Sequence, residues 1–265
     1  MKKTILALFI LSGLIVLASF TDNLRSLDNR AFKRGEYLKY RVFYDSWVTS
    51  GLTAGIGTVR VLDENKKFHG RDTYHLEVIG RSVGLFNWFF KVRDKFESYV
   101  DTETLAPWLF IRQTREGSFR KDDKVVFNQF ENTAKSTTME RDVPPYVQDI
   151  VSAFFYMRNL PMTDLEKGDT LSVMFHLDDS VYNSKILFRG RQDIETKLGR
   201  FRSLVFQPKV AKGEVFDTEY PMTLWVSDDR NHIPLLVESE VIIGSVKIEL
   251  IDYNNLANPL TARID

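Results

Sequence analysis

The chain has 265 residues, of which 43% are hydrophobic and 27% charged, and its 36 basic and 36 acidic side chains leave no net charge. This balance is typical of a folded globular protein, and it argues against a general nucleic-acid binder, which needs a basic face. The absence of cysteine excludes disulfides, thiol catalysis and zinc–thiolate or iron–sulfur sites.

The N-terminal residues have the layout of a secretory signal peptide. Lys2 and Lys3 precede an apolar run from Ile5 to Phe20, which is shorter than the roughly 20 residues needed to span a bilayer. We expect residues 1–20 to be a signal peptide and residues 21–265 to form a single β-rich domain. The mature protein is then expected in an extracytoplasmic compartment, without a spanning segment. The alternative is an uncleaved N-terminal anchor.

Short segments beyond residue 36 alternate apolar and polar residues, which is the pattern of a half-buried strand. Leu38, Tyr40 and Val42, for example, fall on one face. The segments with strand-like character are residues 38–44, 59–61, 74–78, 96–100, 108–114, 125–130, 171–177, 186–188, 201–206, 223–226, 234–238 and 246–251. About a dozen short strands at regular spacing predict one all-β sandwich, open barrel or strongly curved sheet.

Residues 149–158 break this pattern. They follow Pro144 and Pro145, end before Pro161, and place apolar residues at helical spacing. Further apolar residues make the segment apolar on most sides, so a helix here must be covered nearly all round. The overall prediction is a mainly β protein, an antiparallel curved sheet or open half-barrel, with one apolar helix packed on the concave face.

One motif suggests an enzyme. Residues 80–84 match G-x-S-x-G, in which a serine nucleophile lies on a tight turn between a strand and a helix. His176 and His232 lie downstream of Ser82, where that class of hydrolase has its base. The surrounding pattern is a β-meander rather than alternating strands and helices, which favours a glycine-flanked strand end. A serine hydrolase using Ser82 stays open as an alternative.

The histidines and acidic pairs do not predict a metal site. The histidines lack metal-ligand spacing and are expected at the surface; they are His69, His75, His176 and His232. The acidic pairs lack the pattern of a calcium loop and are expected in turns; they are Asp122–Asp123, Asp178–Asp179 and Asp228–Asp229. We expect no catalytic residue, no metal and no cofactor.

Residues 85–91 form the most apolar short run after the signal peptide. Large aromatic side chains are usually buried, so core packing is the first expectation, whereas an exposed patch would mark a lipid or partner contact. Aromatic residues of this run and of the helix are the candidate ligand-binding residues: Phe86, Trp88, Phe89, Phe154 and Phe155. An open sheet lined by such residues can exchange internal contacts for contacts with an apolar ligand.

Five groups of motifs occur in a fixed order along the mature chain. They are Phe32-x-x-Gly35-Glu36-x-Leu38-x-Tyr40; Arg93-Asp94-Lys95-Phe96-Glu97; Asp101-x-x-Thr104-Leu105-x-Pro107; Asp149-x-x-Ser152-x-x-x-Tyr156-x-Arg158; and Leu224-Trp225-x-Ser227-x-Asp229-x-x-x-Pro234 with Gly244. In this order the chain resembles a bacterial exported family, domain of unknown function 3108, from about Phe32 to Tyr253. That family has no established activity, so the resemblance implies a periplasmic, β-rich protein and supplies no catalytic residue.

At the level of fold, a curved sheet around one apolar helix also resembles the open-barrel carriers of lipids and lipoproteins in bacterial envelopes. We therefore expect a non-enzymatic exported envelope protein that binds an apolar ligand or lipid between sheet and helix, and no nucleic acid. Besides the hydrolase, the alternative is a structural or assembly factor whose exposed strand edge binds another envelope polypeptide.

Overall fold

The computed structural model describes residues 24–45, 51–209, 219–240 and 245–264. The expected signal peptide, residues 1–20, and Gly244 of the last motif lie outside these residues. Within the described ranges, no helix is long and apolar enough to cross a membrane.

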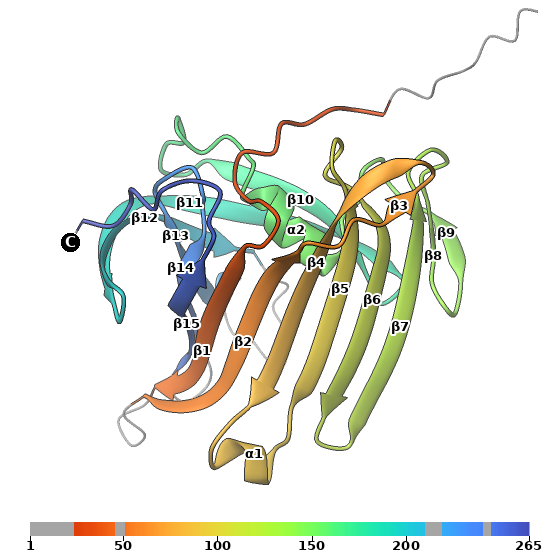
Figure 1. Ribbon diagram of the computed structural model, residues 1–265. Coiled ribbons are helices and arrows are strands. Elements are labelled where there is room, and N and C mark those ends of the chain that lie inside the picture. Colours follow the sequence, from red (N-terminus) through yellow and green to blue (C-terminus); the bar gives the residue numbers. More distant parts are fainter. Residues whose placement is uncertain (1–23, 46–50, 210–218, 241–244, 265) are drawn as a thin grey trace, which may run out of the picture.

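The described residues form one antiparallel sheet of fifteen strands and two short helices (Figure 1). The strands are β1 (Tyr37–Asp45), β2 (Leu52–Leu62), β3 (Lys67–Phe68), β4 (Arg71–Ser82), β5 (Arg93–Asp101), β6 (Pro107–Glu116), β7 (Phe119–Asn128), β8 (Thr133–Lys135), β9 (Glu140–Asp142), β10 (Thr170–Leu177), β11 (Ser180–Thr196), β12 (Gly199–Pro208), β13 (Met222–Ser227), β14 (Pro234–Glu240) and β15 (Ser245–Asn254). The helices are α1 (Phe86–Phe89) and α2 (Ile150–Met157). The mainly β, antiparallel prediction is therefore confirmed.

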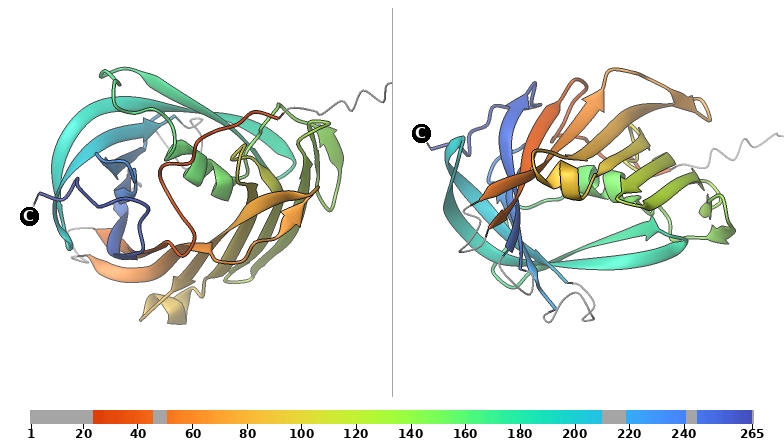
Figure 2. Two further views of the ribbon diagram at one scale, coloured as in Figure 1. Left: turned by 45° about the horizontal axis from the view of Figure 1, so that its top comes forward. Right: turned by 90° about the horizontal axis from the view of Figure 1, so that it is seen from below.

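The strand order explains why the curved sheet does not close into a barrel. It runs β10-β11-β12-β13-β14-β15-β1-β2-β4-β5-β6-β7-β8-β9, with β3 paired to β4 alone. The last strand thus pairs with the first in the middle of the sheet, while β9 and β10 form its two edges. These edges are consecutive along the chain, and α2 connects them from inside the curve (Figure 2).

Residues of the connection cover part of the gap between the two edges. Gln148 lies parallel to the edge strand β10: its N–H donates to Met174 at 2.9 Å, and its carbonyl accepts from the His176 N–H at 2.7 Å. The tip of the β10–β11 hairpin reaches β6 and β7, where Arg112 pairs with Asp178 at 3.1 Å. Side chains and a short backbone contact therefore bridge the open seam, the gap between the edge strands β9 and β10, which are not paired with each other.

Local sequence explains where α2 begins. The carboxylate of Asp149 accepts hydrogen bonds from the Val151 and Ser152 N–H groups at 2.7 and 2.8 Å, and the Ser152 hydroxyl accepts from the Asp149 N–H. This is a capping box, which satisfies backbone donors that a helix start leaves free. The helix runs from Ile150 to Met157, one residue shorter at each end than the segment that the sequence indicates.

The helix joins separate parts of the core. Among the described residues, buried apolar side chains form three clusters: one on β2 and β4–β8, one on β1, β11, β12, β14 and β15, and one on β11–β13. Phe155 belongs to the first cluster, Phe154 packs against the first and second, and Met157 packs against the third. A helix in contact with all three must be apolar on most sides, as its sequence predicts.

Some sequence-based expectations about elements are wrong. The strand around residues 186–188 is part of β11, which has 17 residues and continues through a bulge between Phe188 and Gly190. Asp122 and Asp123 lie within β7 rather than in a turn. Asp178 and Asp179 do form the β10–β11 turn, with positive φ angles of 50° and 57°.

Two of the four histidines are buried, which contradicts the expected surface position. His75 lies between the carboxylates of Glu64 and Glu97, at 2.9 and 3.0 Å, and stacks on Tyr99. His176 is only 2% exposed, with its ring 5.9 Å from that of Phe127, and burial lowers its pKa. The alternation in β10 suggests a solvent face, but β7 and the residues before α2 cover it.

Candidate functional site

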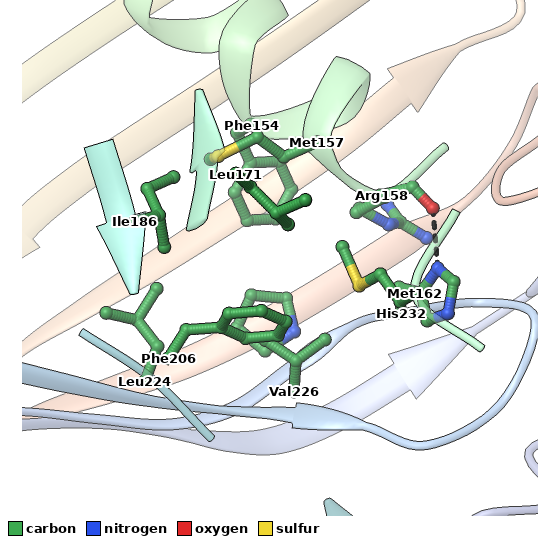
Figure 3. Close-up of a pocket in the computed structure, with 11 residues that line it drawn as sticks. Phe154, Met157, Arg158, Met162, Leu171, Ile186, Phe206, Leu224, Val226 and His232 are labelled. Atoms are coloured by element: carbon green, nitrogen blue, oxygen red, sulfur yellow. Dashed lines mark hydrogen bonds between the residues drawn. The ribbon is translucent and has the colours of Figure 1, made fainter. Parts of the chain in front are cut away.

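Two adjoining hollows lie between α2 and the inner face of β10–β13, and Figure 3 shows the residues that line the first of them. Their volumes are about 60 and 200 Å³. They share Phe154, Met157, Ile186 and Leu224, so we treat them together as the inner cavity. A single water molecule needs about 10–15 Å³ by the same measure, so the inner cavity has room for a narrow chain of atoms.

The pairing of the strands accounts for the wall that faces α2. Phe188 lies opposite Phe206, and Phe206 lies opposite Leu224 on the next strand. Paired residues of neighbouring strands point to the same face, so these side chains form one continuous apolar surface. The next residue of β12, Gln207, points outward and accepts a hydrogen bond from Arg189 at 2.6 Å.

The polar groups at one end of the inner cavity are already engaged. The buried Arg158 guanidinium donates to both carboxylate oxygens of Glu36, at 2.6 and 3.0 Å, and to the carbonyls of Ala31 and Asn231, each at 2.9 Å. The Nδ1 atom of His232 lies 2.7 Å from the Arg158 carbonyl (Figure 3). These contacts fix the end of α2, and little hydrogen-bonding capacity is left for a ligand.

A second apolar hollow, the glycine pocket, lies on the same concave face near α1. Its volume is about 270 Å³, and Gly55, Gly57 and Gly80 form its floor. Gly57 lies opposite both Tyr40 and Gly80 in the sheet, which places these residues on the inner face. A Cβ atom on Gly57 would approach no atom closer than 3.8 Å, so the missing side chain leaves the space open.

The structure does not bring the five predicted ligand-binding residues into one site. Phe154 lines the inner cavity, whereas Phe155 is 1% exposed on another side of α2, with its ring 4.8 Å from Phe32. Phe86 lines the glycine pocket. Trp88 and Phe89 are 80% and 75% exposed. Core packing of residues 85–91 is therefore wrong, because α1 lies in the connection beyond the end of β4.

The inner cavity also contains residues that the sequence reasoning did not select. Met157 belongs to the predicted helix, and Ile186, Phe206 and Leu224 belong to predicted strands. The alternation of the sequence predicts their apolar character. It does not predict which strand faces lie opposite the helix, because that depends on the order of β10–β13 in space.

The Ser82 hydroxyl belongs to the lining of the glycine pocket and has two hydrogen-bond partners. It donates to Asn87 at 3.2 Å and accepts from the Val92 N–H at 3.0 Å. The expected bases have other neighbours: His232 contacts the Arg158 carbonyl and His176 packs on Phe127. Among the described residues, no cluster of three or more His, Asp or Glu side chains could hold a metal ion.

Fold and cavities together define an open, β-barrel-like protein with an internal helix and an apolar interior. The chain belongs to the family described as "Protein of unknown function (DUF3108)", whose model matches residues 39–251. Comparison with curated protein sequences finds no match.

Comparison with solved structures finds similar chains at low sequence identity. A β-barrel-like protein of domain of unknown function DUF1849 from Brucella abortus has a TM-score of 0.54 and 12% identity, covering 86% of this chain and 99% of its own. A "putative lipoprotein" from Parabacteroides distasonis has a TM-score of 0.38 and 10% identity, covering 88% and 100%. A "putative exported protein" from Bacteroides fragilis has a TM-score of 0.32 and 10% identity, with the same coverage.

Proposed function

We propose that this protein is a non-enzymatic, exported envelope protein that holds an apolar chain, such as the acyl chain of a lipid, in the inner cavity. The observation that carries the proposal is the apolar hollow between α2 and β10–β13, walled by residues such as Phe154, Met157 and Leu224. The signal-peptide layout of residues 1–20 supports export.

The chemistry of the wall favours an apolar ligand over a polar one. A polar group buried without a hydrogen-bond partner costs several kcal/mol, about 2–7 depending on the reference state. The cationic group at the cavity, Arg158, is held by Glu36 and two backbone carbonyls. An apolar chain gains free energy from burial there, about 0.8 kcal/mol for each methylene.

Flexible side chains give the inner cavity a way to adapt to a ligand. Met157 and Met162 both line it. Methionine is unbranched and packs adaptably, so it adjusts to chains of different shape more readily than a branched residue does.

The edges of the sheet give less support to an assembly factor that adds a strand. The β10 edge is partly occupied by Gln148, and β9 has three exposed residues, each of them charged. Short charged edges discourage pairing with another chain. Binding in the inner cavity is therefore the function that the geometry supports best.

A substitution that fills the inner cavity tests this function. Ser184 lines it, and its neighbour Asn183 is exposed on the opposite face of β11. We expect a dansyl-labelled fatty acid to bind the wild-type protein with a saturable rise in fluorescence. Ser184→Leu should weaken this binding about tenfold or more, because the new side chain takes the space of the ligand.

Asn183→Leu is the matched control, since it adds the same side chain outside the inner cavity. It should bind the fatty acid like the wild type, and circular dichroism checks that both variants are folded. Equal binding by a folded Ser184→Leu variant, or no binding by the wild type, contradicts the proposed function.

A further inference from the structure

The helix α1 and the β6–β7 turn lie at the same end of the sheet (Figure 1). The segments around them carry a group of exposed apolar side chains. We name it the aromatic rim. Its members, with their exposed fractions, are Leu85 (68%), Trp88 (80%), Phe89 (75%), Phe90 (53%) and Phe119 (50%). Exposed apolar residues are common singly, but a continuous group of this kind marks an interaction surface.

Backbone contacts hold the two parts of the aromatic rim together. The Gly117 N–H in the β6–β7 turn donates to the Lys91 carbonyl at 2.9 Å, and Val92 forms a bridge with Glu116. The Phe90 ring packs against Gly117, at 2.8 Å from the position that a Cβ atom would take there. The fold thus holds both segments beside each other and leaves Trp88 and Phe89 in solvent.

Basic side chains outnumber acidic ones at the aromatic rim, whose acidic neighbours include Asp94 and Glu116. Residues 81–93 and 117–121 contain no aspartate or glutamate. Arg81, Lys91 and Arg93 in the first segment and Arg120 in the second are exposed, and none of these four is ion-paired with another described residue. The two arginines with hydrogen bonds, Arg93 and Arg120, donate to backbone carbonyls and an amide, which leave their charge uncompensated.

We propose that the aromatic rim docks on the anionic surface of a phospholipid membrane. Tryptophan and phenylalanine insert at the boundary between head groups and acyl chains, and nearby basic residues are attracted to anionic lipids. The aromatic rim has both aromatic and basic side chains, and α1 lies on a connection that projects from the sheet between β4 and β5 (Figure 1). A projecting shape suits insertion into a lipid layer better than it suits a groove for a protein segment.

The aromatic rim also borders an apolar hollow. Phe86 and Phe90 line the glycine pocket on the concave face of the sheet. A surface that contacts lipid would therefore lie directly beside an internal apolar space. The docking proposal does not depend on this connection or on a ligand in the inner cavity.

Vesicle co-sedimentation of the mature protein tests the docking proposal. We expect binding to phosphatidylglycerol–phosphatidylcholine vesicles that weakens as salt rises, and weak binding to phosphatidylcholine alone. A Trp88→Ser, Phe89→Ser double variant should bind the anionic vesicles about tenfold or more weakly. Lys91→Gln should weaken binding about fivefold.

Met174→Ser is the matched control, because Met174 is 46% exposed on β10, outside the rim. It should bind vesicles like the wild type. The rim variants should also keep wild-type fatty-acid binding, so that failure of docking and failure of the inner-cavity function are seen separately. The proposal is overturned if the wild type binds no vesicles or binds neutral vesicles equally well, or if the Trp88→Ser, Phe89→Ser variant keeps the wild-type affinity. Absence of vesicle binding would point to a protein partner instead.

Discussion

Asp149 combines two opposing effects at a single buried carboxylate. Hydrogen bonds from Ser98, Val151 and Ser152 stabilise its charged form, while complete burial disfavours the charge. Burial is the larger effect and raises the pKa of Asp149 from 3.8 to about 6. The residue that starts α2 therefore makes the stability of the protein depend on pH.

The sign of this dependence follows from the direction of the pKa change. Between about pH 4 and pH 6 the folded protein binds a proton at Asp149 more readily than the unfolded chain does, so stability falls as pH rises through this window. Across this window the titration of Asp149 lowers the free energy of unfolding by about 3 kcal/mol. Asp149→Asn keeps a residue suited to cap the helix and removes this titration.

We therefore expect the free energy of unfolding of the wild type to fall, relative to that of Asp149→Asn, as pH rises from about 4 to about 6. Urea denaturation of both proteins at several pH values measures the difference. Parallel curves for the two proteins would show that the buried carboxyl does not titrate in this window.

The same residue shows what could be predicted at this scale. Asp149 and Ser152 have the spacing of a capping box in the sequence, and apolar spacing identifies Phe154 on the helix. The burial of His176 and the exposure of Trp88 could not be read in this way. Both depend on whether a distant strand covers the position, which local pattern does not encode.

Among the elements, the β10–β11 hairpin is the part of the sheet that bridges the open seam. The Asp178 carboxylate in its turn pairs with Arg112 at 3.1 Å and with Lys121. The next residue, Asp179, accepts hydrogen bonds from Thr138 and Arg141. These contacts join β10–β11 to β6–β9 without a ladder of backbone hydrogen bonds.

Asp178→Asn should loosen this contact while keeping the turn, because asparagine also tolerates the positive φ of 50°. We expect faster amide hydrogen exchange at the hairpin tip and a global loss of only about 1 kcal/mol or less, since the pairs are partly exposed. Asp193→Asn, which removes an exposed pair with Arg200 elsewhere on β11, is the control. Unchanged exchange at the tip of the Asp178→Asn variant would mean that the ion pairs do not hold the seam.

The sequence identifies most elements of the sheet but not all of their limits. Alternation at Leu38 and Tyr40 marks β1 because both side chains are buried. The continuation of β11 past Gly190 is hidden, because a bulge shifts the alternation and much of the strand is exposed. The short helix α1 has too few residues to show a helical period.

At the scale of the whole molecule, α2 packs inside an open barrel. It lies inside the curve of the sheet (Figure 2) and contacts all three apolar clusters. The inner cavity lies where α2 meets β10–β13. The order of the strands could not be predicted, because the pairing of β15 with β1 joins residues far apart in sequence. That pairing places the two halves of the sheet around one helix, with the inner cavity beside it.

Native mass spectrometry of the protein, purified gently from its own envelope fraction, tests the central claim most directly. A bound apolar chain predicts a discrete extra mass that extraction with organic solvent removes and that Ser184→Leu greatly reduces. A mass equal to the processed chain alone, unchanged after incubation with envelope lipids, would contradict a ligand-binding inner cavity.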